Sequence, residues 1–196
     1  MGIATLLDDA SEQAVRALWI ELETRYGLCA APRAVPFPHC SFQIAADYDL
    51  PALSQLLPRI AAQHAPVSVV VSGLGAFEEP EPVLYLAVQR NAALDALHMA
   101  LWRALVEGGV AREWSPLYAP DVWIPHITLA QLDLTLEGLH AIQSAWADRD
   151  LRREIQFSDL TLGGQAPGET RQRALARYPL GGVGGQASGQ SGGLAN

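Results

Sequence analysis

The sequence predicts an α+β fold with largely antiparallel sheets, in which one lobe of the molecule is duplicated. Strand-like and helix-like segments alternate along the chain, and several neighbouring strand segments are close enough to form hairpins. The same order also occurs twice. His39 begins a strand, a helix follows and a β-rich segment reaches Gly73, while His126 begins a second series that reaches Gly163. The two series have similar lengths, and this spacing favours a duplicated lobe over a solenoid.

Composition and charge limit the classes of function. The chain has 196 residues, and its 13 basic residues, all arginine, face 21 acidic residues, which gives a net charge of −8. This balance argues against a protein that holds long duplex nucleic acid, although one arginine in a pocket is enough to bind a single phosphate. Cys29 and Cys40 are too few for a disulfide framework, and the first residues lack the basic start of a signal peptide. We expect a cytoplasmic protein without a membrane span.

One folded domain is expected over residues 1–180, followed by a tail over residues 181–196. The tail contains seven glycines and no charged or aromatic residue. This composition is typical of a flexible segment that contributes nothing to a hydrophobic core.

The first half of the chain contains two predicted helices and four predicted strands. Asp9 and Ser11 supply N-cap chemistry for the first helix, and Gly27 ends it. Ala30–Pro38 contains three prolines and is predicted to be a loop. The predicted strands are Gly2–Leu7, His39–Ala45, Val67–Phe77 and Val83–Val88, and the predicted helices are Asp9–Tyr26 and Leu50–His64.

The second half follows the same logic. Asn91 can cap a helix that runs to Glu107, where two glycines end it. Arg112–Pro125 is rich in aromatic residues and is expected to be an irregular connection. The remaining predicted elements are the strand Ile127–Gln131, the helix Thr135–Trp146, and the strands Ile155–Leu162 and Thr170–Tyr178.

A Pro-His-x-Ser/Thr motif occurs once in each series. In the first it contains His39 and Ser41, and in the second it contains His126 and Thr128. Residues two apart in a strand point to the same side, so each strand is predicted to present an imidazole beside a hydroxyl. Gln43 is expected to share the face of His39 and Ser41, and Cys40 is expected in the core behind them.

Four further residues are candidates for substrate binding. Tyr118 and Trp123, just before the second motif, either stack on a nucleobase or pack between the lobes. Arg171 and Arg173 on the last strand either bind phosphate or form a charged, solvated strand edge.

The other three histidines carry no motif. His64, His98 and His140 lie on predicted helices, where we expect them at the surface or at its boundary. The spacing of the histidines and cysteines fits no zinc-binding pattern, so no metal site is predicted.

The two motifs resemble those of the 2H phosphoesterase superfamily, whose members carry two His-x-Ser/Thr motifs on two related lobes. The sequence is most similar to the 2′-5′ RNA ligase-like branch, which includes RNA 2′,3′-cyclic phosphodiesterases, over about Gly2 to Leu180. The resemblance implies a pseudo-twofold, bilobal pair of antiparallel sheets with outer helices and a central groove. It also implies that His39, Ser41, His126 and Thr128 are the catalytic residues.

The function expected from this resemblance is hydrolysis of a 2′,3′-cyclic phosphate or a 2′-5′ phosphodiester of a nucleotide or a short RNA end, with no metal or other cofactor. Two histidines can divide the roles of general acid and general base, because an imidazole pKa of about 6.5 keeps both forms accessible near neutral pH. Ser41 and Thr128 would donate hydrogen bonds to the phosphoryl oxygens. Hydrolysis and ligation use the same pair in opposite senses, which leaves the acid and the base unassigned.

Two other classes of function stay open. One is a module that binds a cyclic nucleotide or an RNA end without turning it over. The other is a scaffold protein in which the motifs are vestigial. The physiological substrate and the oligomeric state are also left open by the sequence.

Overall fold

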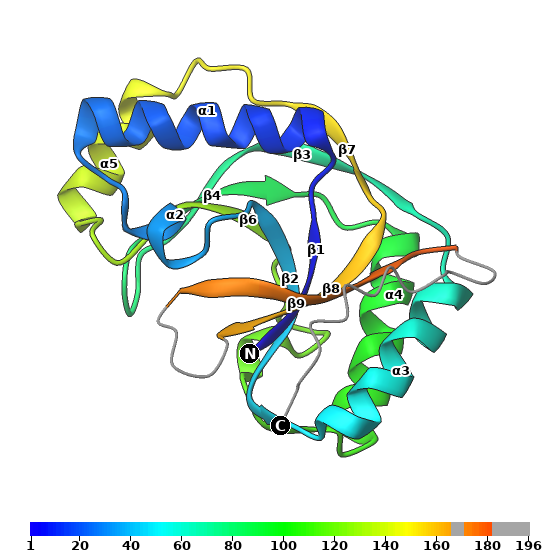
Figure 1. Ribbon diagram of the computed structural model, residues 1–196. Helices are drawn as coiled ribbons and strands as arrows, with labels where there is room; N and C mark the ends of the chain where they lie inside the picture. The colour runs from blue at the N-terminus through cyan, green and yellow to red at the C-terminus, as the bar shows by residue number, and fades with distance from the viewer. Residues whose placement is uncertain (166–170, 182–196) are drawn as a thin grey trace, which may run out of the picture.

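Nine strands pair antiparallel in one strongly curled sheet, and helices pack on its outside (Figure 1). This description covers residues 1–165 and 171–181 of the computed structural model. In chain order the strands are β1 (Gly2–Leu6), β2 (His39–Tyr48), β3 (Val67–Phe77), β4 (Val83–Val88), β5 (Ala111–Trp114), β6 (His126–Ala130), β7 (Arg153–Phe157), β8 (Asp159–Gln165) and β9 (Gln172–Pro179). Their order across the sheet is β7-β3-β4-β6-β2-β1-β8-β9, and β5 pairs with β2.

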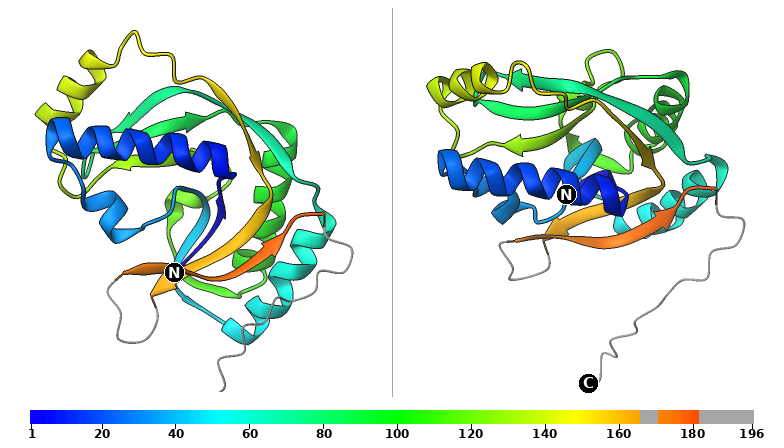
Figure 2. Two further views of the ribbon diagram at one scale, coloured as in Figure 1. Left: turned by 45° about the horizontal axis from the view of Figure 1, so that its top comes forward. Right: turned by 90° about the horizontal axis from the view of Figure 1, so that it is seen from above.

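The helices lie in two groups. They are α1 (Asp9–Tyr26), α2 (Ala30–Ala34), α3 (Leu50–Gln63), α4 (Ala92–Trp102) and α5 (Leu136–Ala145), with a π-helical turn at Arg103–Glu107 and a 3₁₀ turn at Pro116–Tyr118. Helices α1 and α5 lie at one end of the curled sheet, and α3 and α4 lie at the other (Figure 2). Helix α1 contacts β6, and α4 contacts β2. Helices α1 and α4 therefore each support a strand that carries one of the two motifs.

The strand order confirms the predicted duplication. The series β1-α1-β2-α3-β3 and β4-α4-β6-α5-β8 occur in the same chain order, and their strands take equivalent places on either side of the β6–β2 pair. Strands β6 and β2 are joined by a single residue pair, Cys40 and Ile127. The two predicted sheets are therefore the two halves of one continuous sheet, which meet where the two motifs lie.

Buried apolar side chains form one cluster that extends along the described chain from Ile3 to Leu180. Leu22 of α1, Leu57 of α3 and Leu101 of α4 are fully buried against the sheet. Removing this apolar surface from water is the main driving force that holds the helices on the sheet.

Two local predictions near the N-terminus can be compared with the structure. Asp8, not Asp9 or Ser11, is the N-cap of α1, because its carboxylate accepts a hydrogen bond from the backbone N–H of Ser11. Gly27 ends the helix as predicted, with a φ of 73° that a residue with a Cβ adopts only with strain.

The predicted loop Ala30–Pro38 contains the short helix α2. Its first N–H groups, those of Cys29 and Ala30, donate to the carboxylate of Asp133 at 2.8 and 2.7 Å. A carboxylate at a helix N-terminus satisfies unpaired N–H groups and opposes the helix dipole. Asp133 is distant in the chain, so no local pattern predicts this cap.

Two further segments differ from expectation because of long-range strand pairing. The predicted strand Ile155–Leu162 is two strands, since β7 pairs with β3 in one half of the sheet and β8 pairs with β1 in the other. The expected irregular connection Arg112–Pro125 contributes to β5, which pairs with β2. Both differences arise from partners that are distant in the chain.

The predicted tail falls almost entirely outside the described residues, of which Gly181 is the last. Among residues 1–165 and 171–181, no helix is both long and apolar enough to cross a membrane.

Candidate functional site

The pairing of β2 with β6 brings the two motifs together. Cys40 and Ile127 form the cross-strand pair and are fully buried. In an antiparallel pair the neighbouring residues point to the opposite face, so this register places His39 opposite Thr128 and Ser41 opposite His126. Residues directly opposite each other have Cβ atoms about 5 Å apart. The four motif side chains therefore form one cluster on one face of the sheet.

Both imidazoles are held in the same way. The Nδ1 atom of His39 lies 3.0 Å from the carbonyl oxygen of Phe37, and that of His126 lies 2.7 Å from the carbonyl oxygen of Ile124. A carbonyl oxygen only accepts hydrogen bonds, so each Nδ1 carries a hydrogen and donates it. In the neutral rings Nε2 therefore bears the lone pair, which is the tautomer that a general base needs.

Burial shifts the titration of both histidines. Desolvation lowers the pKa of His39, and the nearby charge of His126 lowers it further, while the hydrogen bond to Phe37 opposes the shift. Desolvation also lowers the pKa of His126. The register of β2 and β6 places the two rings close enough for the charge on one to influence the protonation of the other. Both rings are therefore disposed toward the neutral form at pH 7, and protonation of one disfavours protonation of the other.

Aromatic rings surround the histidine of the second motif. Phe77 meets the ring of His126 edge to face at a centroid distance of 5.2 Å, and Tyr85 lies 5.0 Å from it. On the other half of the sheet, Phe37 contacts His39 in an edge arrangement at 5.7 Å. These contacts restrict the rotation of each imidazole and keep its orientation fixed.

Two tryptophans support the hydroxyl residues of the motifs in matching ways. The indole N–H of Trp123 donates to the carbonyl oxygen of Ser41 at 3.0 Å, and that of Trp19 donates to the carbonyl oxygen of Thr128 at 3.3 Å. Trp123 is only 2% exposed, so the structure shows it packed in the core with an edge toward the site. Its proposed stacking on a nucleobase stays a prediction.

His98 corrects the expectation that the histidines without a motif lie at the surface. It is 1% exposed, because α4 packs against β2 and turns this side chain inward. Its ring stacks on Trp123 at a centroid distance of 3.8 Å, and its Nε2 lies 3.1 Å from the carbonyl oxygen of Phe42. His98 thus supports Trp123 from behind, and no spacing in the sequence distinguishes it from the other helical histidines.

Lowering the pH from 7 to 5 is expected to destabilise the protein by roughly 2 kcal/mol through His98 alone. Burial lowers the pKa of His98 to about 4, and the charge of Arg90 contributes in the same direction. The unfolded chain, with a histidine pKa of about 6.5, binds the proton first. This contribution to stability is therefore complete above about pH 6.5 and is lost as the pH falls toward 4.

Denaturant unfolding of the wild type and of His98→Gln at pH 7, 6 and 5 tests this expectation. The glutamine retains an N–H donor for Phe42 but does not titrate. The wild type should lose stability more steeply than the variant, and parallel pH dependences would contradict the role given to His98.

Gln43 does not share the face of His39 and Ser41, contrary to expectation. The pairing of β1 with β2 shifts between Ala4–Ser41 and Ile3–Gln43, so β2 contains one extra residue at that point. Such a bulge reverses the alternation of the side chains that follow. Gln43 is therefore 1% exposed and bonded to Tyr48, and Ile44 takes its place on the face of the site.

Tyr118 lies against the first motif. Burial raises the pKa of its phenol to about 12, and the neighbouring side chain of Ser41 opposes this shift. The phenol is therefore un-ionised at neutral pH and lies beside the hydroxyl of Ser41. Tyr118 also lines a cavity beside His126, described below.

The structure places the side chains of Arg171 and Arg173 in solvent, where both are exposed. Gln172 lines the cavity beside His39, so Arg173 falls on the opposite face of β9 and Arg171 precedes the strand. A shift in the β8–β9 pairing then places Arg177 opposite Thr161. Binding of phosphate by Arg171 and Arg173 stays a prediction.

The sequence did not predict that Arg177 lies next to the cavity beside His39, opposite Thr161. It forms an ion pair of 2.8 Å with Asp159, a carboxylate that is 1% exposed and also accepts a hydrogen bond of 2.7 Å from Thr161. The bulge in β9 that puts Arg177 on the same face as Thr161 has no signature in the sequence.

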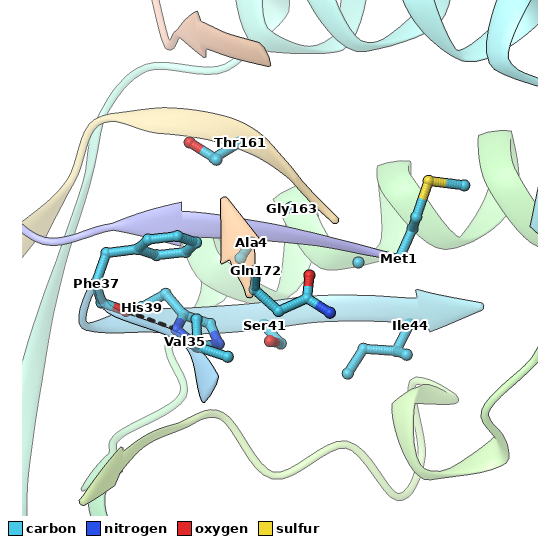
Figure 3. A pocket seen from close by; sticks show the side chains of 11 residues that line it. Met1, Ala4, Val35, Phe37, His39, Ser41, Ile44, Thr161, Gly163 and Gln172 are labelled. Atoms are coloured by element: carbon cyan, nitrogen blue, oxygen red, sulfur yellow. Dashed lines mark hydrogen bonds between the residues drawn. The ribbon is translucent and has the colours of Figure 1, made fainter. Parts of the chain in front are cut away.

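Two cavities flank the pair of histidines. One, of about 170 Å³, is lined by His39 and Ser41 of β2, by Thr161 and Gly163 of β8, and by Gln172 of β9 (Figure 3). The other, of about 470 Å³, is lined by His126 together with the β3–β4 connection and residues 117–124. Thr128 is not among the described residues that line either cavity.

No three His, Cys, Asp or Glu side chains within residues 1–165 and 171–181 are arranged to hold a metal ion. Cys40 is fully buried, as predicted, and burial raises the pKa of its thiol to about 12. The side chains of the cluster that can transfer protons near neutral pH are therefore the two imidazoles.

A family model described as the 2′-5′ RNA ligase superfamily matches residues 7–166. A search of curated proteins finds no match.

Solved structures with the same fold are similar over most of their length. TT0787 of Thermus thermophilus has a TM-score of 0.61 and 18% identity, with 93% of this chain and 98% of that chain covered. E. coli LigT complexed with 3′-AMP has a TM-score of 0.55 and 17% identity, with 91% and 96% covered. A structure described as a phosphoesterase has a TM-score of 0.57 and 16% identity, with 91% and 96% covered.

These TM-scores show a common fold, and the family model covers most of the chain, including both motifs. The duplicated sheet is that of the 2H phosphoesterases, and the chain belongs to the 2′-5′ RNA ligase superfamily.

Proposed function

We propose that the protein is a phosphodiesterase that opens a 2′,3′-cyclic phosphate, or cleaves a 2′-5′ phosphodiester, on a nucleotide or a short RNA end without a metal ion. Its catalytic residues are His39, Ser41, His126 and Thr128. The observation that supports this proposal is that the two imidazoles are held by the same kind of hydrogen bond, from Nδ1 to the carbonyl oxygen two residues earlier. Each neutral ring therefore has its lone pair on Nε2.

The chemistry needs one proton removed and one delivered. The neutral imidazole takes a proton from water through Nε2 as the water oxygen forms a bond to phosphorus. The bond from phosphorus to one ribose oxygen breaks, and the second histidine, protonated, gives its Nε2 proton to that oxygen. The two rings have exchanged protonation states when the cyclic phosphate is open, and proton exchange with solvent restores them.

The two hydroxyls act on the phosphoryl group. Ser41 and Thr128 lie opposite the histidine of the other motif in the β2–β6 register. Their O–H groups can donate to the two non-bridging oxygens, where negative charge increases in the transition state. The hydrogen bonds from the indoles of Trp123 and Trp19 hold this part of the sheet in place.

Turnover of a 2′,3′-cyclic mononucleotide should follow a bell-shaped pH profile that EDTA does not change. One histidine must be neutral and the other protonated, so activity falls at both extremes. Burial lowers the pKa of both histidines, which places the acidic limb below the usual imidazole value. Initial rates from about pH 4.5 to 9, with and without EDTA, test the proposal. The absence of turnover on cyclic nucleotides and on 2′-5′ dinucleotides, or its loss on chelation, would overturn it.

Removing one hydroxyl should have a smaller effect than removing an imidazole. Ser41→Ala and Thr128→Val are each expected to lower kcat by about 10- to 100-fold, because one hydrogen bond to a charged phosphoryl oxygen is lost while proton transfer remains. The shape of the pH profile should stay the same. Steady-state kinetics of both variants check this, with Ser115→Ala in the 111–125 segment as a control. An unchanged kcat in both variants would remove the hydroxyls from the mechanism.

A further inference from the structure

The larger cavity has the size and shape to hold one organic group beside the proposed reaction centre. Its volume is about 470 Å³, within the range of small-molecule pockets, and His126 forms part of its wall. The other walls come from the β3–β4 connection, with Phe77 and Val83, and from residues 117–124. A group attached to a phosphate held by the two histidines can therefore extend into this space.

The lining is mostly apolar although much of it faces solvent. Leu117 is 72% exposed, Val122 52% and Ile124 49%, and all three line the cavity. Exposed apolar side chains grouped around a cavity are typical of a ligand-binding surface. Together with the ring of Phe77 they provide surfaces against which the flat faces of an aromatic base can pack.

The charged groups of the cavity select against phosphate. Apart from His126, the ionisable side chains among its described lining residues are Glu79, Glu81 and the phenol of Tyr118. No lysine occurs in the chain, and no arginine is among the described lining residues. Two carboxylates repel a phosphate and accept hydrogen bonds from N–H groups. The occupant is therefore the base of the substrate, and the phosphodiester stays at the histidines.

We propose that this cavity is a base subsite selective for nucleobases with an exocyclic amino group, with the carboxylates of Glu79 and Glu81 as the acceptors. The proposal rests on the cyclic phosphodiesterase function proposed above. Cytosine, adenine and guanine each offer amino hydrogens to a carboxylate. Uracil presents carbonyl oxygens on either side of a single N–H, and these oxygens face the carboxylates unfavourably.

Cytosine and uracil give the sharpest comparison, because the two pyrimidines have the same size and differ in the amino group at C4. The value of kcat/KM for 2′,3′-cyclic CMP is expected to exceed that for 2′,3′-cyclic UMP by about tenfold, within the range measured for one specific base contact. In the double variant E79Q/E81Q the ratio should fall to near one, because an amide offers a donor as well as an acceptor. Each single variant then shows which carboxylate contributes more.

Glu78 supplies a matched control. It precedes Glu79 in the same connection, lies outside the cavity lining, and contacts His140 at the surface at 3.4 Å. E78Q removes the same charge as either single variant and should leave the ratio of the two substrates unchanged. A fall of the ratio in E78Q equal to that in the double variant would mean that net charge, rather than the subsite, determines the preference.

Binding of the products separates this inference from the proposed function. Ring opening gives a 2′- or a 3′-monophosphate. The affinities for both monophosphates of cytidine and of uridine, measured by calorimetry, are expected to show the same preference as the rates. Turnover of both cyclic substrates with a ratio near one in the wild type would overturn the base subsite and leave the phosphodiesterase intact. Selective binding of the cytidine monophosphates without turnover of any cyclic nucleotide would support the subsite and overturn the phosphodiesterase.

Discussion

His39→Ala and His126→Ala should each lower kcat on a 2′,3′-cyclic mononucleotide by about 10²- to 10⁴-fold. This is the usual contribution of a positioned general acid or base. The effect should fall on kcat more than on substrate affinity, because Ser41, Thr128 and the cavities on either side remain. A decrease of the same size in both variants is expected, since one proton transfer is useless for turnover without the other.

The pH profiles of the two variants should also assign the roles, which the symmetrical geometry does not. Loss of the general base removes the acidic limb of the bell, and loss of the general acid removes the alkaline limb. The charge of His126 contributes to the lowered pKa of His39. In His126→Ala this contribution is lost, so the pKa of His39 rises and the remaining limb of the profile should move toward higher pH. Residual rates measured from about pH 4.5 to 9 with high enzyme concentrations give both results.

His140→Ala provides the control for the loss of an imidazole. His140 is exposed on α5, where it contacts Glu78. This variant should retain the wild-type kcat and pH profile. Wild-type turnover in both His39→Ala and His126→Ala, with the fold intact by circular dichroism, would contradict the catalytic role of the cluster.

The motif residues could be predicted from the sequence because strand alternation is a local property. Two residues of separation place His39 beside Ser41 and His126 beside Thr128, whatever the strands pair with. The buried neighbours Cys40 and Ile127 then fix which face points away from the core. The symmetry of the two strands also follows from the sequence, since the motifs occupy equivalent places in a repeat.

Apart from the N-cap of α1, the departures come from contacts between segments distant in the chain. The bulge that turns Gln43 inward arises from the pairing of β1 with β2. The bulge that places Arg177 opposite Thr161 arises from the pairing of β8 with β9. His98 is buried because α4 packs on β2, and α2 begins where Asp133 accepts its N–H groups. Sequence patterns give the faces of single elements, while the register between elements depends on the whole fold.

Trp123→Ala should be the most destabilising change at the edge of the site, at about 3–5 kcal/mol, which is a large fraction of the stability of an ordinary domain. Trp123 stacks on His98, contacts Phe42 at a centroid distance of 5.8 Å, and lies below the guanidinium of Arg90 at 5.7 Å. Removing the indole leaves a cavity among these groups and leaves the carbonyl oxygen of Ser41 without this donor. Denaturant unfolding at pH 7 measures the loss.

This variant also decides between the two interpretations that the sequence left open for Trp123. A residue whose main role is to stack on a base would lose substrate affinity on truncation with little change in stability. A residue 2% exposed, with His98 stacked on its ring, has almost no free surface for a base, so stability should change first. Trp123→Phe, which keeps most of the packing but not the N–H, should lose about 1–2 kcal/mol. A stable Trp123→Ala protein with a greatly raised KM would instead make this tryptophan part of the substrate-binding surface.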